Sequence, residues 1–120
     1  MVAVSLPSRR RDERPWGYFD QFTGGEPSTV KILHVRAGEE FSLQTHAHRD
    51  EFWRIIAGSG SVIIGEQTHP AEIAAEFWIP RTVAHRAMGG SENDLEILEI
   101  SFGQFDENDI VRLADTYGRT

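Results

Sequence analysis

The sequence predicts an antiparallel all-β domain that closes into a sandwich or a barrel. From Arg14 onward, short apolar or alternating segments are separated by Gly, Pro, Asn and Ser at regular intervals, a pattern typical of antiparallel β proteins. About ten short strands cannot lie in one open sheet without long unpaired edges, so closure is expected. Such a barrel encloses a pocket, with inward and outward side chains alternating along each strand.

Turn residues bound the expected strands in chain order. Because Gly supplies positive φ and Pro fixes φ while removing a backbone donor, Gly24-Gly25 ends the first strand, Ala37-Gly38 the second and Pro80 the seventh. Gly58-Ser59-Gly60 lies between two strand-like runs with no helix to follow, so it does not fit a dinucleotide-binding loop. Gly89-Gly90 follows the eighth strand. The expected strands are 17–22, 29–36, 40–45, 51–57, 60–64, 68–73, 76–79, 84–87, 95–102 and 110–113.

Length predicts one folded domain over residues 14–120, preceded by a flexible arm over residues 1–13. A chain of 120 residues can bury roughly two-thirds of the surface that it exposes when unfolded. The arm ends in the polar run SRRRDER, residues 8–14, which reaches the first residue of the domain and in which Asp12 and Glu13 interrupt the arginines. A solvated terminus is the expected behaviour of this run, and an arm for an anionic surface is the alternative.

Composition restricts both the chemistry and the partners. The chain has no cysteine, which removes disulfides and thiolate chemistry and leaves nitrogen and oxygen as metal ligands. Its net charge of −7 argues against nucleic acid, because phosphate backbones are bound through dense Lys and Arg. No apolar run approaches the roughly 20 residues that cross a bilayer. We therefore expect a cytoplasmic protein that binds neither nucleic acid nor a membrane.

Four potential metal ligands gather between Gln44 and Glu51. Residues two apart on a strand point to the same face, so Gln44, His46 and His48 are predicted to share one face. Glu51 follows a short bend and shares its parity with Trp53, which places a carboxylate beside an indole on a cavity wall. A buried carboxylate needs compensation, which a divalent cation supplies. A buried hydrogen-bond network without a metal is the alternative.

The spacing of these residues resembles the two-part cupin signature. Its first half is matched by Gly38, Gln44, His46, Glu51 and Gly58, with Gln44 in place of the first histidine, and its second half by Pro80 and His85. The order S-L-Q-x-H-x-H-R-x-E-x-W, from Ser42 to Trp53, is similar to type II mannose-6-phosphate isomerases, found as the C-terminal part of bifunctional isomerase/mannose-1-phosphate guanylyltransferases. Further matching pieces are 14–17, 79–80, 85–86, 98–100, 109–112 and 115–119.

The sequence departs from the family pattern at several positions near the expected site. Ala47 interrupts a run of histidines, and Asp50 and Phe52 replace the Ala before the glutamate and the His after it. Thr82 stands where the second motif normally has Gly, and Gly89 where it often has Asn. None of these changes removes a ligand, so they bear on the shape of the pocket and on the substrate. No guanylyltransferase domain accompanies the cupin, so nucleotidyl transfer is not expected.

The resemblance implies a fold, a cofactor and an activity. The fold would be a double-stranded β-helix, the cupin or jelly-roll barrel, with short N- and C-terminal extensions, and the protein would be a homodimer. The activity would be interconversion of mannose 6-phosphate and fructose 6-phosphate through an enediol whose negative charge a divalent metal ion stabilises. Zinc is the expected metal, with manganese, cobalt, nickel or iron as alternatives. The implied metal ligands are Gln44, His46, Glu51 and His85.

Proton transfer and substrate binding need further residues. His48 is the candidate for proton transfer, with Glu99 as a second choice; direct ligation of the metal and an exposed loop end are the alternatives for His48. A sugar phosphate is an anion, and arginine suits it through its bidentate fork. The expected substrate-binding residues are Lys31, Arg49, Arg81, Arg112 and Trp53, with solvated surface charge as the alternative for each cation.

Two other functions fit the same ligand set. The first is a non-catalytic or regulatory metal-containing cupin that binds a sugar. The second is an iron-dependent oxygenase, which needs open coordination positions for O2. His34 and His69 are expected to be surface or hydrogen-bonded residues outside the site.

Overall fold

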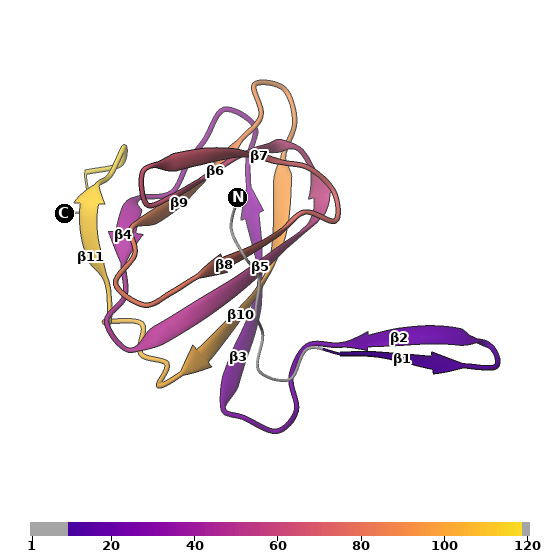
Figure 1. The fold of residues 1–120 in the computed structure, drawn as a ribbon. Coiled ribbons are helices and arrows are strands. Elements are labelled where there is room, and N and C mark those ends of the chain that lie inside the picture. The colour runs from indigo at the N-terminus through magenta and orange to yellow at the C-terminus, as the bar shows by residue number, and fades with distance from the viewer. Residues whose placement is uncertain (1–9, 119–120) are drawn as a thin grey trace.

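The computed structural model describes residues 10–118 and confirms the all-β prediction. This range contains eleven strands and no helix. They form a two-stranded hairpin and two larger sheets that make a barrel (Figure 1). The strands are β1 (Arg10–Arg14), β2 (Gly17–Gln21), β3 (Ser28–Val35), β4 (Leu43–Thr45), β5 (Arg49–Gly58), β6 (Gly60–Ile64), β7 (Gln67–Ala71), β8 (Glu76–Ile79), β9 (His85–Gly89), β10 (Leu95–Gly103) and β11 (Val111–Ala114).

The two barrel sheets are antiparallel throughout. One has the order β3-β10-β5-β8 and the other the order β11-β4-β9-β6-β7. Most neighbours within a sheet are distant in the sequence, because the chain crosses repeatedly between the two sheets. This arrangement confirms the predicted double-stranded β-helix fold.

All ten expected strands are present, and the largest shift is at 40–45. There, regular pairing covers only Leu43–Thr45, and Glu40 makes an isolated bridge to Met88. The ends of the other strands differ from the expected ends by at most two residues because turn residues bound them.

The structure corrects the expected arm over residues 1–13. Residues 10–13 belong to β1, which pairs with β2 in a register that runs from Arg10 opposite Gln21 to Arg14 opposite Gly17. The charged sequence RRDER has no apolar alternation, so periodicity gives no signal for this strand. The rest of the expected arm, residues 1–9, and the matching piece at Arg119 lie outside the described residues.

The barrel interior is apolar at one end and polar at the other. The main apolar cluster includes Trp53, Ile55, Val62, Leu95 and Ile97, each at most 1% exposed. Beyond it, buried Glu51, Glu99, Ser101 and His85 form the polar end. On β5, Glu51, Trp53 and Ile55 share the inner face, as alternation predicts.

Within residues 10–118, no helix has the length and apolar character that spanning a membrane would require.

Candidate metal centre

Three buried side chains from separate segments converge at the polar end of the barrel. His46 follows the last residue of β4, Glu51 lies on β5, and His85 is the first residue of β9. Nε2 of His85 lies 3.3 Å from Oε1 of Glu51, and Nε2 of His46 lies 3.6 Å from Oε2 of the same carboxylate. One potential ligand atom from each residue lies within 4.8 Å of the other two.

Backbone carbonyls orient both imidazole rings. Nδ1 of His46 lies 2.7 Å from the carbonyl oxygen of Asp109, and Nδ1 of His85 lies 2.9 Å from that of Val83. A carbonyl oxygen only accepts, so Nδ1 carries a proton in each ring, and Nε2 is the nitrogen that faces Glu51 and has a free lone pair in the neutral ring. Burial lowers the pKa of His46, which keeps this ring neutral and able to bind a cation.

These three residues fit a divalent metal ion. Two ligands bound at about 2.05 Å with a tetrahedral angle lie roughly 3.3 Å apart, close to the observed separations of 3.3 and 3.6 Å. Oε1 of Glu51 and Nε2 of His85 are buried and have no hydrogen-bond partner among the described residues. Unpaired buried polar atoms are costly, and a metal ion would satisfy both. Imidazole and carboxylate ligands suit zinc and other divalent first-row metals.

Arg49 braces this group from one side. Its Nε donates to Oε2 of Glu51 at 3.1 Å, its Nη1 to the carbonyl oxygen of Asp106 at 3.1 Å, and its Nη2 to Nε2 of His46 at 3.2 Å. Burial favours the neutral form of Glu51, but His85, His46 and Arg49 outweigh it and lower the pKa of this carboxyl to about 2. Glu51 is therefore an anion at neutral pH, and all three nitrogens of the Arg49 guanidinium are engaged.

Gln44 lies beside the three-residue group. Its strand pairs with β9 at His85 and with β11 at Arg112. Gln44 is half-buried, and its Oε1 accepts a 3.4 Å hydrogen bond from the hydroxyl of Ser42. The four residues of the predicted ligand set thus lie next to one another, and their role as ligands stays a prediction.

A cavity of about 360 Å³ opens beside this group, and Gln44, His46 and Glu51 form part of its wall. Small-molecule sites commonly have volumes of roughly 300–1,000 Å³, so this cavity has room for a small ligand. Phe41 and Ile110 supply apolar wall.

Glu99 is a second buried carboxyl in the wall of this cavity. Burial, and then the charge of Glu51, raise the pKa of Glu99 to about 7. The indole N–H of Trp53 donates to Oε2 of Glu99 at 3.0 Å, which fixes the orientation of the carboxyl. Glu99 can therefore exchange a proton near neutral pH.

Three cationic side chains line the cavity: Lys31, Arg49 and Arg112. Nζ of Lys31 forms a 2.8 Å ion pair with Glu107 and lies 4.6 Å from the centre of the Phe105 ring. Nε of Arg112 is buried and has no hydrogen-bond partner within residues 10–118. Arg112 thus offers an unsatisfied donor to an anion, in contrast to Arg49.

The alternation argument fails at His48. β4 ends at Thr45, and the chain bends at Ala47 and His48. His48 therefore no longer points to the same face as Gln44. His48 is exposed and is not part of the cavity wall. Of the two alternatives to proton transfer, the exposed loop end is the one that the structure shows.

Two expected substrate-binding residues also lie outside the cavity wall. Arg81 is exposed and pairs with Asp50, with 3.2 Å between Nη2 and Oδ2. Trp53 is fully buried in the apolar core and meets the His85 ring edge-on, with 5.6 Å between ring centres. Trp53 therefore positions Glu99 and His85 from beneath the site.

Sequence reasoning missed the role of Asp109. Its carboxylate accepts hydrogen bonds from the backbone N–H groups of Ala47 at 2.8 Å and His48 at 2.9 Å, while its own carbonyl holds the His46 ring. Asp109 thus fixes the bend that carries His46. The only signal in the sequence was that 109–112 matched a piece of the family pattern.

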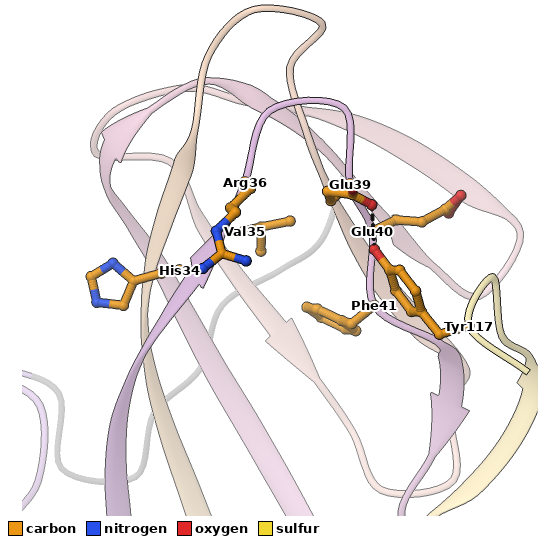
Figure 2. Close-up of a pocket in the computed structure, with 7 residues that line it drawn as sticks. All are labelled: His34, Val35, Arg36, Glu39, Glu40, Phe41 and Tyr117. Carbon is orange, nitrogen blue, oxygen red and sulfur yellow. Dashed lines mark hydrogen bonds between the residues drawn. The ribbon is translucent and has the colours of Figure 1, made fainter. Parts of the chain in front are cut away.

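A second hollow, of about 420 Å³, also has Phe41 in its wall (Figure 2). Tyr117 from the C-terminal segment reaches Glu39 there, and its hydroxyl donates to the Glu39 carboxylate. None of the predicted metal ligands borders this hollow. We therefore assign the site to the smaller cavity.

Comparison with known proteins identifies the family. Residues 5–115 match the family described as "Mannose-6-phosphate isomerase C-terminal". The chain belongs to this family. The sequence-based assignment to the cupin part of type II mannose-6-phosphate isomerases is thereby confirmed.

Relatives in the mannose-6-phosphate isomerase C-terminal family are longer proteins. The chain is 38% identical to the xanthan biosynthesis protein XanB of Xanthomonas campestris pv. campestris, over 92% of this chain and 24% of XanB. It is 37% identical to the alginate biosynthesis protein AlgA of Pseudomonas aeruginosa, over 89% of this chain and 22% of AlgA. It is 35% identical to mannose-1-phosphate guanylyltransferase of Escherichia coli, over 88% and 22% of the two chains. The chain therefore spans less than a quarter of the length of these relatives.

Solved structures agree with the fold expected of this family. A cupin protein from Bacteroides fragilis superposes with a TM-score of 0.60 at 18% identity, over 89% of this chain and 92% of that one. The DMSP lyase DddQ from Ruegeria pomeroyi gives a TM-score of 0.65 at 16% identity, over 80% and 46% of the two chains. At these identities the likeness shows the fold alone, and a shared fold does not determine the reaction.

Proposed function

We propose that this domain holds zinc at His46, Glu51 and His85, with Gln44 as a fourth ligand, and interconverts mannose 6-phosphate and fructose 6-phosphate. The observation that carries the proposal is the content of one 360 Å³ cavity. Its wall brings together His46 and Glu51 of the metal-binding group, a carboxyl whose pKa is raised to about 7, and three cationic side chains. Membership in the family supports the substrate class.

Glu99 would carry the proton in this reaction. The isomerisation removes the proton from C2 of the aldose and returns a proton to C1, while a hydroxyl proton passes from O2 to O1. With a pKa of about 7, Glu99 is ionised in a large fraction of molecules at neutral pH and holds the abstracted proton well enough to return it. The hydrogen bond from Trp53 to Oε2 keeps the carboxyl in place and leaves Oε1 for this exchange.

The metal and the cations would divide the charge of the substrate. A divalent ion at the three-residue group would supply the Lewis acidity that stabilises negative charge on the substrate oxygen as the proton leaves carbon. Arg112, with its buried unsatisfied Nε, would bind the phosphate. Lys31 would assist it, because its ion pair with Glu107 is solvent-exposed and exposed pairs of this kind are weak.

A coupled assay with mannose 6-phosphate tests the proposal. The zinc-loaded protein should form fructose 6-phosphate, and Glu99→Gln should abolish turnover while it keeps the metal and still binds the sugar phosphate in calorimetry. Arg81→Gln is the matched control, since this exposed arginine lies outside the cavity. Unchanged turnover in Glu99→Gln would refute its role in proton transfer.

A non-catalytic metal-containing cupin that binds a sugar is the second candidate. The departures from the family pattern at Ala47, Phe52 and Thr82 favour it, because they change residues near the site and leave the metal ligands in place. This candidate predicts a calorimetric signal with sugar phosphate and no turnover with zinc, manganese or cobalt. Oxygen consumption with Fe(II) would identify the iron-dependent oxygenase instead.

A further inference from the structure

The loop over residues 104–110, which joins β10 to β11 (Figure 1), forms part of the wall of the 360 Å³ cavity. Glu107 and Ile110 are the residues of this loop that line it. The side chain of Glu107 is 72% exposed, and its Oε1 lies 2.8 Å from Nζ of Lys31. The loop therefore places a carboxylate on a cation that an anionic substrate would need.

Lys31 lies on the inner face of β3. It is opposite Glu99 of β10 in the strand register, and both residues line the cavity. Leu33, two residues farther along β3, lines it too, as alternation along a strand requires. The ammonium group of Lys31 lowers the pKa of Glu107, so Glu107 is an anion at neutral pH. A ligand in the cavity and the Glu107 carboxylate thus compete for the same cation.

The backbone of this loop is held on both sides of Glu107. Before it, the carbonyl oxygen of Asp106 accepts a 3.1 Å hydrogen bond from Nη1 of Arg49. After it, the Asp109 carboxylate accepts two backbone hydrogen bonds from the bend before β5. Because the loop is anchored and the Glu107 side chain is exposed, the carboxylate can rotate away from Lys31 without movement of the loop.

We propose that the Glu107 carboxylate occupies the place of the substrate phosphate on Lys31, and that the phosphate displaces it on binding. A phosphate monoester has a charge of about −1.5 to −2 at neutral pH and three strong acceptor oxygens, whereas Glu107 offers a single charge in an exposed ion pair, which is weak. The phosphate therefore wins the exchange. The anion subsite is that of the proposed function, on which this inference rests.

The exchange lowers the affinity for every anion that binds Lys31. Substrate and product of the proposed reaction carry the same phosphate group, so Glu107 weakens the binding of both, and its return to Lys31 accompanies the departure of the product. Glu107→Gln should therefore lower KM for mannose 6-phosphate, and it should lower the dissociation constant of phosphate itself even where no reaction takes place.

Calorimetry of the zinc-loaded full chain with inorganic phosphate tests the exchange without turnover. Glu107→Gln should bind phosphate about three- to tenfold more tightly than the wild type at low salt, because the competing charge is gone. The gain should shrink in about 1 M NaCl, where the Debye length is roughly 3 Å. Glu72→Gln is the matched control: it removes an exposed carboxylate between β7 and β8, outside the cavity wall, and should leave the affinity unchanged.

A double-mutant cycle with Lys31→Gln separates the exchange from a general effect of charge. Glu107→Gln should bring no gain in phosphate affinity to a chain that already lacks the Lys31 charge. An equal gain in the Lys31→Gln chain, or no gain in the wild-type chain, would overturn the proposal. A gain that requires Lys31, together with no turnover of mannose 6-phosphate, would support the exchange and refute the isomerase activity alone.

Discussion

Glu99→Gln should remove a pH dependence from the stability of the metal-free protein. In the unfolded chain this carboxyl ionises near pH 4.5, whereas burial, and then the charge of Glu51, raise its pKa in the folded protein to about 7. Between these values the folded state keeps a proton that the unfolded state has released. The stabilisation is therefore complete below pH 4.5 and is lost as the pH rises through 7. Glutamine does not titrate, so the variant escapes this loss.

The size of the effect follows from the shift in pKa. A change from 4.5 to about 7 corresponds to roughly 3 kcal/mol at 1.36 kcal/mol per unit. Glu99 is only 6% exposed, so solvent screens little of this energy. The hydrogen bond from Trp53 survives in the variant, because glutamine also offers a side-chain oxygen. The unfolding free energy of Glu99→Gln, relative to wild type, should thus rise by roughly 2–3 kcal/mol between about pH 5 and pH 8.

Urea unfolding of EDTA-treated protein, followed by tryptophan fluorescence at several pH values, measures this difference. The slope of the unfolding free energy against urea concentration should be the same for both proteins, so that their unfolding midpoints can be compared. Saturating zinc should shrink the pH dependence of the wild type by offsetting the charge of Glu51. A difference between variant and wild type that stays constant across this pH range would refute the raised pKa of Glu99.

Three further substitutions follow from the same geometry. Arg112→Gln should raise KM for mannose 6-phosphate about tenfold or more, the cost of one charged hydrogen bond, without loss of zinc, whereas Arg81→Gln should leave KM unchanged in the same coupled assay. Asp109→Ala should weaken zinc affinity by about 10–100-fold, because the backbone N–H groups of the bend before β5 lose their acceptor. Asp109→Asn should lose less affinity, and equal zinc affinity in the wild type and both variants would contradict this positioning role. Thr82→Gly should raise the unfolding free energy by about 1 kcal/mol, because Thr82 has a φ of 72°, which favours glycine. A thermal unfolding midpoint no higher than that of the wild type would argue against strain at this residue.

Strand periodicity was sufficient where strands are long and regular. On β5, alternation correctly placed Glu51, Trp53 and Ile55 on the inner face, because this strand continues for ten residues from Arg49 to Gly58. The same rule failed at His48, because β4 is only three residues long. The family pattern has Gly where this chain has Thr82, and the positive φ of Thr82 gives the physical reason for that preference.

Contacts between distant segments could not be predicted from local patterns. Asp109 lies 62 residues from Ala47 in the sequence and fixes the bend next to His46. Arg81 resembled a phosphate-binding residue by its position in the family pattern, yet it is committed to Asp50. The raised pKa of Glu99 depends on its burial and on the charge of Glu51 on the neighbouring strand β5. Each of these outcomes needs the three-dimensional arrangement of the strands, which the spacing of residues along one chain does not contain.

The metal content of the purified protein tests the central claim most directly. After dialysis against zinc and then against buffer, the wild type should retain one ion per chain in elemental analysis, and His85→Ala should retain far less. His48→Ala, which changes an exposed histidine beside the same bend, should retain as much as the wild type. Retention of zinc by His85→Ala, or its loss from His48→Ala, would contradict a metal centre built from His46, Glu51 and His85.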